Sequence, residues 1–200
     1  DRICVKPQIV KKVCQALTST EGQLVISIAA GITTKALSDW LPREQSIIRC
    51  MPNTPALIRQ GITGLYANEY STPEQKENTE QLLGSVGTTL WVTEENKLDV
   101  ITAISGSGPA YFFYLMEQMV MAGIELGITE NEALELTLQT ALGAARLANR
   151  ERQDTPKSLR EKVTSPGGTT QSALQTFKDR GIDEAFKLGI KNAFIRSKEL

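Results

Sequence analysis

Histidine is absent from the 200 residues of this sequence, and its absence removes several kinds of catalytic site at once. Imidazole is the base in serine–histidine and cysteine–histidine catalysis and a common ligand of zinc. Three cysteines are present, Cys4, Cys14 and Cys50, without CxxC spacing and among apolar neighbours. We therefore expect no metal site, and we predict buried, reduced thiols in a cytoplasmic protein.

Neither sign of charge is in excess, because 22 lysines and arginines face 23 aspartates and glutamates. Nucleic acid and anionic membrane surfaces are bound through a basic excess, so we expect neither as a partner. The chain is 40% hydrophobic and 22% charged, which is enough apolar material for the core of one or two domains.

One long apolar run stands out at residues 109–128, directly after a Ser-Gly-Ser-Gly segment. Its only charged or amide side chains are Glu117, Gln118 and Glu125, which fall within about 100° of a helical circumference. A helix with so little polar surface is buried in a core or between two subunits. A membrane span is the alternative, disfavoured by the two carboxylates and the lack of basic flanks.

The first 93 residues alternate between the patterns of β-strands and α-helices. Short apolar runs predict strands, and apolar residues three or four positions apart predict helices. The predicted strands cover residues 3–5, 24–28, 47–51, 62–66 and 88–92, and the predicted helices cover 8–17, 33–41 and 72–85. This order indicates an α/β layer with a mostly parallel sheet.

Beyond residue 93 no strand is predicted, and the pattern is helical. Helices are expected at residues 95–104, 109–128 and 129–149. A short helix should start near residue 154, another should follow the segment 165–170 and end at about residue 178, and a last helix should cover residues 183–200. The predicted fold class is therefore α/β followed by all-α. We place the domain boundary between residues 1–93 and residues 94–200.

Prolines and small residues follow three of the predicted strands, in the segments Lys6-Pro7, Ala29-Ala30-Gly31 and Pro52-Asn53-Thr54. The carboxyl ends of parallel strands form the ligand-binding edge of an α/β sheet, and small residues let a flat ligand approach the backbone. The alternative is that these are ordinary strand-to-helix turns. The sequence contains neither a G-x-G-x-x-G fingerprint nor a Walker motif.

A second candidate site is the segment Ser165-Pro166-Gly167-Gly168-Thr169-Thr170, which opens a predicted helix. The first N–H groups of a helix lack intrahelical partners and lie at the positive end of its dipole. Backbone donors of Gly168, Thr169 and Thr170, with the hydroxyls of Ser165 and Thr170, are therefore suited to a carboxylate. The alternative is a Pro-Gly turn whose threonines only cap the helix.

Taken together, five segments resemble the pyrroline-5-carboxylate reductase family. They are Val5-Lys6-Pro7, Ile28-Ala29-Ala30-Gly31, Met51-Pro52-Asn53-Thr54-Pro55, Ser105-Gly106-Ser107-Gly108-Pro109-Ala110-Tyr111 and the segment from Ser165 to Thr170. The resemblance implies a Rossmann-type domain, here a partial parallel sheet, followed by a helical dimerisation domain. It also implies a homo-oligomeric oxidoreductase of proline biosynthesis that reduces 1-pyrroline-5-carboxylate to L-proline with NADPH or NADH.

The resemblance assigns roles to individual residues. It implies cofactor contacts at Cys4, Val5, Lys6, Pro7, Ile28, Ala29, Ala30 and Asn53. It implies substrate contacts at Glu95, Ser165, Gly168, Thr169 and Thr170, with Thr102 as a candidate proton donor near the ring nitrogen. Hydride adds to an iminium carbon that is already electrophilic, so such a reaction needs no histidine.

Relative to that family, the sequence lacks the first strand, the glycine-rich loop and the second strand. We therefore expect a piece of the enzyme that has little or no reductase activity by itself. Some members place a carboxylate where Gln153 stands and an asparagine where Lys162 stands, so the roles of these two residues stay open. The choice between NADPH and NADH and the number of subunits stay open as well.

Two other functions remain as alternatives. The first is a cofactor-free dimerisation or proline-binding module, which the missing glycine-rich fingerprint would suit. The second is a related β-hydroxyacid-type dehydrogenase, which would have a catalytic lysine in the long apolar helix. Residues 109–128 contain no lysine, and this disfavours the second alternative.

Overall fold

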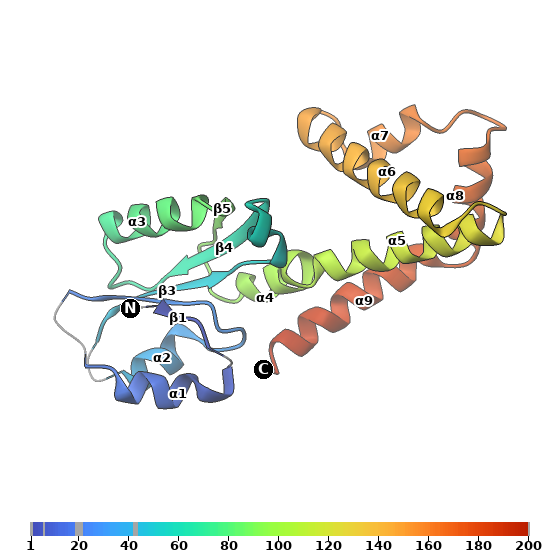
Figure 1. Cartoon of the computed structure of the whole chain (residues 1–200). Coiled ribbons are helices and arrows are strands. Elements are labelled where there is room, and N and C mark those ends of the chain that lie inside the picture. The colour runs from blue at the N-terminus through green and yellow to red at the C-terminus, as the bar shows by residue number, and fades with distance from the viewer. Residues whose placement is uncertain (1, 6, 19–21, 42–43, 200) are drawn as a thin grey trace. The chain divides into compact units, whose positions relative to one another are not determined.

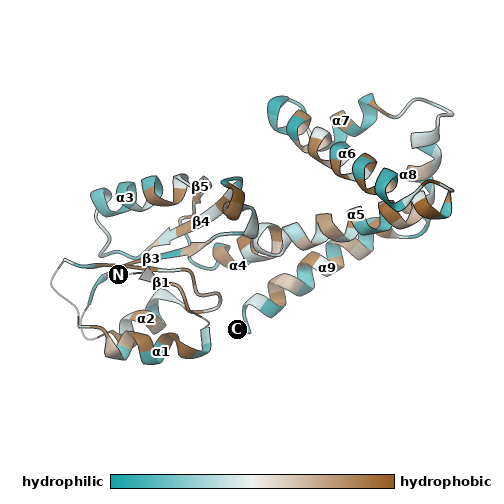
Figure 2. Cartoon of the chain, viewed as in Figure 1, coloured by the Kyte–Doolittle hydropathy of each residue, from teal (hydrophilic) through white to brown (hydrophobic). Residues whose placement is uncertain are grey.

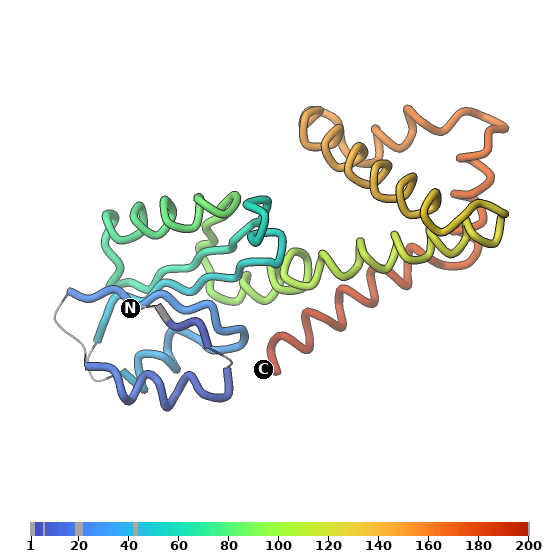
Figure 3. The backbone as a smooth tube through the Cα atoms, viewed as in Figure 1, coloured from blue at the N-terminus to red at the C-terminus, as the bar shows by residue number. Residues whose placement is uncertain are grey.

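The computed structural model describes residues 2–5, 7–18, 22–41 and 44–199. The chain divides into two compact units, one formed by Asp1–Pro109 with Gly189–Leu200 and the other by Ala110–Leu188. Figure 1 labels the helices and strands, and Figure 3 traces the backbone. The boundary predicted after residue 93 marks where strands give way to helices, and it stays a prediction.

A five-stranded sheet forms the centre of the first unit (Figure 1). Its strands follow the order of the chain: β1 (Arg2–Ile3), β2 (Leu24–Ser27), β3 (Ser46–Met51), β4 (Gly61–Ala67) and β5 (Gly87–Trp91). Neighbouring strands are parallel except β3 and β4, which are antiparallel. The predicted α/β class and mostly parallel sheet are confirmed, but the sheet is mixed because β4 and β5 run opposite to the first three strands.

The direction of β4 follows from its short connection to β3. Only residues 52–60 join the two strands, whereas a crossover between parallel strands needs a dozen residues or more. The connection contains a 3-10 turn, η1 (Thr54–Ile58), after which Arg59 adopts the left-handed conformation with φ of 60°. The chain reverses there, and β4 returns alongside β3.

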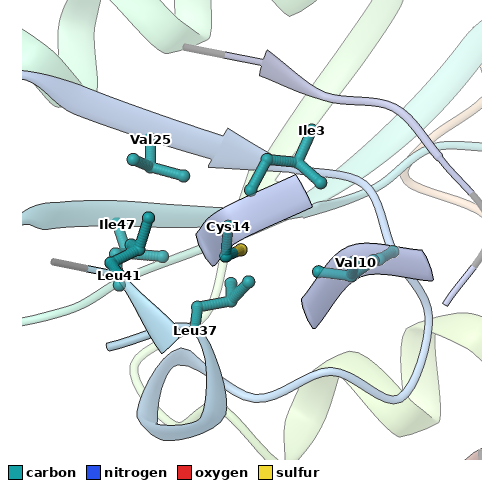
Figure 4. Packing of buried hydrophobic residues seen from close by; sticks show 8 residues of the cluster. Ile3, Val10, Cys14, Val25, Leu37, Leu41 and Ile47 are labelled. Atoms are coloured by element: carbon teal, nitrogen blue, oxygen red, sulfur yellow. The ribbon is translucent and has the colours of Figure 1, made fainter. Parts of the chain in front are cut away.

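Helices cover both faces of this sheet (Figure 1). On one face, α1 (Pro7–Ala16) and α2 (Thr34–Trp40) enclose a core with the first three strands. This core consists of Ile3, Val10, Cys14, Val25, Ala29, Leu37, Leu41 and Ile47 (Figure 4). On the other face lies α3 (Pro73–Gly84), whose Leu83 packs on a smaller core of Ile48, Cys50 and Leu65. The first unit therefore has a hydrophobic interior of its own.

The second unit is helical. Its elements are α5 (Gly108–Glu125), α6 (Glu130–Arg150), α7 (Pro156–Lys162), α8 (Thr169–Asp179) and α9 (Ile182–Ser197), except that the start of α5, up to Pro109, and the larger part of α9, from Gly189 on, belong to the first unit. Within the first unit, the hydroxyl of Ser197 donates to the carboxylate of Asp99 at 2.9 Å. Gly127, with φ of 102°, follows the end of α5, so this helix stops three residues before the predicted end at 128.

The helices of the second unit leave large apolar side chains exposed within one chain. Figure 2 marks the hydrophobic residues of α5 and α6 in brown. On α5 the exposed fractions are 64% for Phe112, 62% for Phe113 and 48% for Met119. The burial predicted for this helix is therefore not provided by the described part of the chain itself. Among the described residues, no helix is long and apolar enough to cross a membrane.

The three cysteines have different environments. Cys14 and Cys50 are buried, as predicted, but Cys4 is exposed, so the prediction of three buried thiols is wrong for this residue. Cys4 comes directly after β1, at the point where the chain leaves the sheet. Burial raises the pKa of the Cys50 thiol to about 12 and also raises the pKa of Cys14.

We expect an alkylating reagent at neutral pH to modify Cys4 at least about tenfold faster than Cys50, because the reactive thiolate needs both ionisation and access. Timed labelling with peptide mass spectrometry measures both rates. Equal labelling rates of Cys4 and Cys50 in the folded protein would contradict the exposure of Cys4 and the burial of Cys50.

The folded protein should also lose stability as the pH rises from about 8.5 toward 12, since the Cys50 thiol loses its proton at lower pH in the unfolded chain than in the folded one. Urea unfolding at two alkaline pH values measures this loss.

Candidate active site

Three strand ends meet at one edge of the sheet in the first unit. The register aligns Ile3 of β1 with Ser27 of β2, and Ser27 with Arg49 of β3, and these strands run in the same direction. The segments predicted to contact a cofactor therefore leave the sheet at the same edge. They are Cys4 and Val5 after β1, Ile28, Ala29 and Ala30 after β2, and Asn53 after β3, while Pro7 begins α1 and Lys6 lies outside the described residues.

The loop after β2 is anchored where it leaves the sheet. The N–H of Ile28 donates to the carbonyl of Ile3 at 3.2 Å, and the N–H of Ala29 donates to the hydroxyl of Ser27 at 3.3 Å. Ala29 is buried in the core, whereas Ile28 is partly exposed. Gly31, with φ of 73°, supplies the turn that leads into α2.

Asn53 joins two segments through its side-chain amide. Its Nδ2 donates to the carbonyl of Ser105 at 3.1 Å, and its Oδ1 accepts from the N–H of Ile62 at 3.0 Å. An amide has two N–H donors and two acceptor lone pairs. The cofactor contact predicted for Asn53 stays a prediction, and it would use the donor and the lone pair that these bonds leave.

The segment between α4 (Lys97–Ile101) and α5 is a π-helix, η2 (Thr102–Gly106). The N–H of Ser107 donates to the carbonyl of Thr102 at 2.8 Å, five residues back. The helix predicted for 95–104 is formed by α4 and continues from residue 102 as this π-helix, whose Ser105 carbonyl accepts the bond from Asn53. Single π-turns inside helices are frequent at functional sites.

The hydroxyl of Thr102 donates to the carbonyl of Leu98 at 2.8 Å, one turn earlier in the helix. Its proton is thereby engaged, and its oxygen remains available as an acceptor. The role of Thr102 as a proton donor stays a prediction, and it requires this hydroxyl to exchange its backbone partner for the substrate.

Glu95 connects the β5–α4 segment to α2 and β3. Its Oε1 accepts from the N–H of Thr34 at 2.6 Å and from the guanidinium of Arg49 at 2.7 Å, and its Oε2 accepts from the Thr34 hydroxyl at 2.8 Å. The Arg49 side chain is only 6% exposed, and breaking a buried ion pair by removing one partner costs about 3–5 kcal/mol. Tyr66 lies opposite Arg49 on β4, and burial, followed by the Glu95 charge, raises the pKa of its phenol.

The turn from Ser165 to Thr170 lies in the second unit, where it opens α8. The N–H of Gly168 donates to the carbonyl of Ser165 at 3.0 Å, so this donor closes the turn. The N–H of Gly167 donates to Oε1 of Gln171 at 2.6 Å. Gly168 is the N-cap and has no side chain to cap the helix, so a carboxylate would use the N–H groups of Thr169 and Thr170.

Lys162, whose role was left open, is paired with an aspartate that the sequence did not single out. Its Nζ lies 2.6 Å from Oδ2 of Asp154, and the hydroxyl of Ser158 donates to Oδ1 at 2.9 Å. The bonds from Lys162 and then Ser158 lower the pKa of Asp154. No hydrogen bond of the Gln153 side chain enters this cluster among the contacts described, and its role stays open.

Sequence reasoning missed several partners of the predicted residues, chiefly Thr34, Arg49 and Gln171. The only available signal was Arg49 itself, a charged residue inside the apolar run of a predicted strand. Such a residue needs a counter-charge when buried. The pairing with Glu95, 46 positions away, could be found only from the fold.

An α/β sheet with small residues at its parallel strand ends, joined to a helical unit, is the architecture of Rossmann-type oxidoreductases with a helical second domain. A family described as pyrroline-5-carboxylate reductase dimerisation matches residues 95–200. The pyrroline-5-carboxylate reductase of Pseudomonas aeruginosa is 48% identical over 200 residues, which is 99% of this chain and 73% of that protein. The chain belongs to the pyrroline-5-carboxylate reductase family.

Solved structures agree with this assignment. The structure of the pyrroline-5-carboxylate reductase from Coxiella burnetii superposes with a TM-score of 0.90 at 42% identity, covering 99% of this chain and 74% of that one. The Plasmodium falciparum pyrroline carboxylate reductase, solved with NADP bound, gives a TM-score of 0.89 at 28% identity, covering 99% of this chain and 75% of that one.

Proposed function

We propose that this chain carries the reduction of 1-pyrroline-5-carboxylate to L-proline in proline biosynthesis, by hydride transfer from NADPH or NADH. The observation that carries the proposal is the match, at 48% identity over 99% of the chain, to a relative named for this reaction. The strand-end edge of the sheet and the Ser165 turn, both predicted as binding segments, support it. A cytoplasmic location remains a prediction.

The cofactor would lie along the edge where β1, β2 and β3 end. The backbone fits a flat ligand there, because the loop after β2 is built from Ala29, Ala30 and Gly31 and is anchored to Ile3 and Ser27. When bound, the cofactor supplies a hydride to the imine carbon. The residues expected to hold it are Cys4, Val5, Lys6, Pro7, Ile28, Ala29, Ala30 and Asn53.

The Ser165 turn would bind the substrate carboxylate. Thr169 and Thr170 supply backbone donors at the positive end of α8, an 11-residue helix, and the hydroxyls of Ser165 and Thr170 add two more. Gly168 shapes this turn, since a Cβ at that position would lie 3.1 Å from the Ser165 carbonyl oxygen. When the hydride adds to the imine carbon, the protonated imine nitrogen becomes the secondary amine of proline. The chain has therefore mainly to bind and orient the substrate and the cofactor.

The helical part would self-associate as a homodimer or a larger homo-oligomer. The matched family is described by its dimerisation, and apolar side chains of α5 are exposed in one chain. A partner of the same kind would bury them. The alternative function, a cofactor-free module, would form the dimer but would not catalyse the reaction, and an assay of reductase activity distinguishes the two.

We expect Thr170→Ala to raise the KM for 1-pyrroline-5-carboxylate about tenfold, since one charge-assisted hydrogen bond to a carboxylate is worth about 1.5–3 kcal/mol. Thr169→Ala should cost less if that residue contributes mainly its N–H. The loss of NADPH absorbance measures the rate, using protein made from the complete reading frame that contains these residues.

Thr176→Ala is the matched control, because it removes the same hydroxyl from the same helix, where it donates to the Ser172 carbonyl at 3.1 Å. Titration calorimetry with an unreactive five-membered-ring carboxylate tests binding without turnover. Unchanged affinity in Thr170→Ala would move the substrate elsewhere and leave this turn as a helix cap. Absence of any reductase activity in the parent protein would favour the cofactor-free module.

A further inference from the structure

Glu95 ties α2 to the segment entering α4. It stands between Trp91, the last residue of β5, and Lys97, the first of α4. Both of its carboxylate oxygens are used, one by Arg49 and the N–H of Thr34, the other by the Thr34 hydroxyl. The three bonds of 2.6–2.8 Å are in the range of charge-assisted hydrogen bonds.

Thr34 is the first residue of α2 and directly follows the loop of residues 28–33. This loop is anchored at its beginning by the bonds of Ile28 and Ala29 to β1 and β2. At its far end Thr33 caps the N–H of Ala36, and Glu95 accepts the N–H of Thr34. The loop is therefore fixed at both ends, and its far anchor comes from 61 positions along the chain.

Arg49 makes this anchor rigid. It lies on β3, its side chain is 6% exposed, and it holds Glu95 Oε1 at 2.7 Å. Since β3 is the central strand of the sheet, the carboxylate is fixed to a strand that is paired on both sides, by β2 and by β4. Glu95 cannot turn toward a ligand without leaving the Arg49 charge buried and unpaired.

We infer that Glu95 is a positioning residue, which holds the loop of residues 28–33 in shape for the cofactor through Thr34 and Arg49, and is not a contact of the substrate. This inference rests on the proposed function, since that loop is a proposed cofactor segment. It changes the role that the family resemblance gave to Glu95. The two roles predict different kinetic constants.

The test is Glu95→Gln, which keeps the size of the side chain and removes its charge. We expect the KM for NADPH to rise about tenfold while the KM for 1-pyrroline-5-carboxylate changes less than about twofold. Hydrogen exchange of the amides of residues 28–34 should become at least about tenfold faster. Glu94→Gln is the matched control, because it makes the same change one position earlier, where Glu94 pairs with Lys97 at the surface, and it should alter none of these values.

Thr34→Val covers the case in which Glu95→Gln does not fold. It removes only the hydroxyl donor to Oε2, and it should shift the NADPH KM and the exchange in the same direction by a smaller factor. Thr34→Ser restores the hydroxyl and should restore both values. A raised KM for the substrate with an unchanged KM for NADPH would overturn the inference, and so would unchanged exchange at residues 28–34 in both Glu95→Gln and Thr34→Val. If the parent protein has no reductase activity but exchange is still faster in Glu95→Gln, the role of Glu95 in holding the loop of residues 28–33 would stand and the proposed function would be wrong.

Discussion

Met119→Asp is expected to abolish self-association and to raise the concentration needed for a folded second unit at least a hundredfold. Met119 lies on α5, where it is 48% exposed within one chain. In an assembly that covers this helix, an aspartate there would be buried without a counter-charge, which costs several kcal/mol. A factor of one hundred corresponds to only about 2.7 kcal/mol, so the estimate is a modest one. Ala122→Glu on the same helix should act in the same direction.

Gln118→Glu is the control for this experiment, because it also adds one negative charge to α5 but at a position that is already polar. Sedimentation velocity with circular dichroism, followed over dilution from micromolar to nanomolar, separates dissociation from unfolding. If the unmodified protein stays folded as a monomer at nanomolar concentration, its apolar helices need no second copy. Self-association through α5 would then be wrong.

Gly87→Ala is expected to destabilise the first unit by more than about 3 kcal/mol, or to prevent its folding. Gly87 of β5 lies opposite Gly61 of β4, with φ of 154°. A Cβ at position 87 would overlap the carbonyl group of Gly61, which is backbone and cannot swing aside. The two strands would have to separate, and severe effects of this size are typical of steric conflict at special backbone positions.

Gly84→Ala is the matched substitution three residues earlier. A Cβ there meets no atom within 4 Å, and Gly84 closes the helical span of α3, so alanine should stabilise the helix by up to about 1 kcal/mol. Urea unfolding of both variants measures the difference. Equal stability of the two variants would show that the Gly61 and Gly87 backbones are not in close contact.

Much of the fold could be predicted because local chemistry and long-range packing agree there. Thr72 and Pro73 indicate a helix start, and the Thr72 hydroxyl does accept from the N–H of Gln75. Thr129 forms the expected capping box with Glu132. The direction of β4 could not be inferred from its own apolar residues, because it depends on how a nine-residue connection turns at Arg59.

The candidate site was predictable to a smaller extent. The strand-end segments were found because parallel strands place their carboxyl ends at one edge, a rule that needs no distances. The bond from Asn53 to the Ser105 carbonyl of the π-helix was missed because it crosses 52 positions of sequence. The partners of Glu95 were missed for the same reason, and this pairing changes the interpretation of a residue that the motif alone would give to the substrate.

The bond between Ser197 and Asp99 has a consequence for the order in which this protein can be completed on the ribosome. Residues 189–200 belong to the first unit, yet they are synthesised after the whole second unit. The sheet can form early around its own two cores, but Asp99 of α4 can bond to Ser197 only after residue 197 has been synthesised. A stalled or C-terminally shortened chain would therefore display a formed sheet beside an unfinished α4, which is a natural target for quality-control proteases.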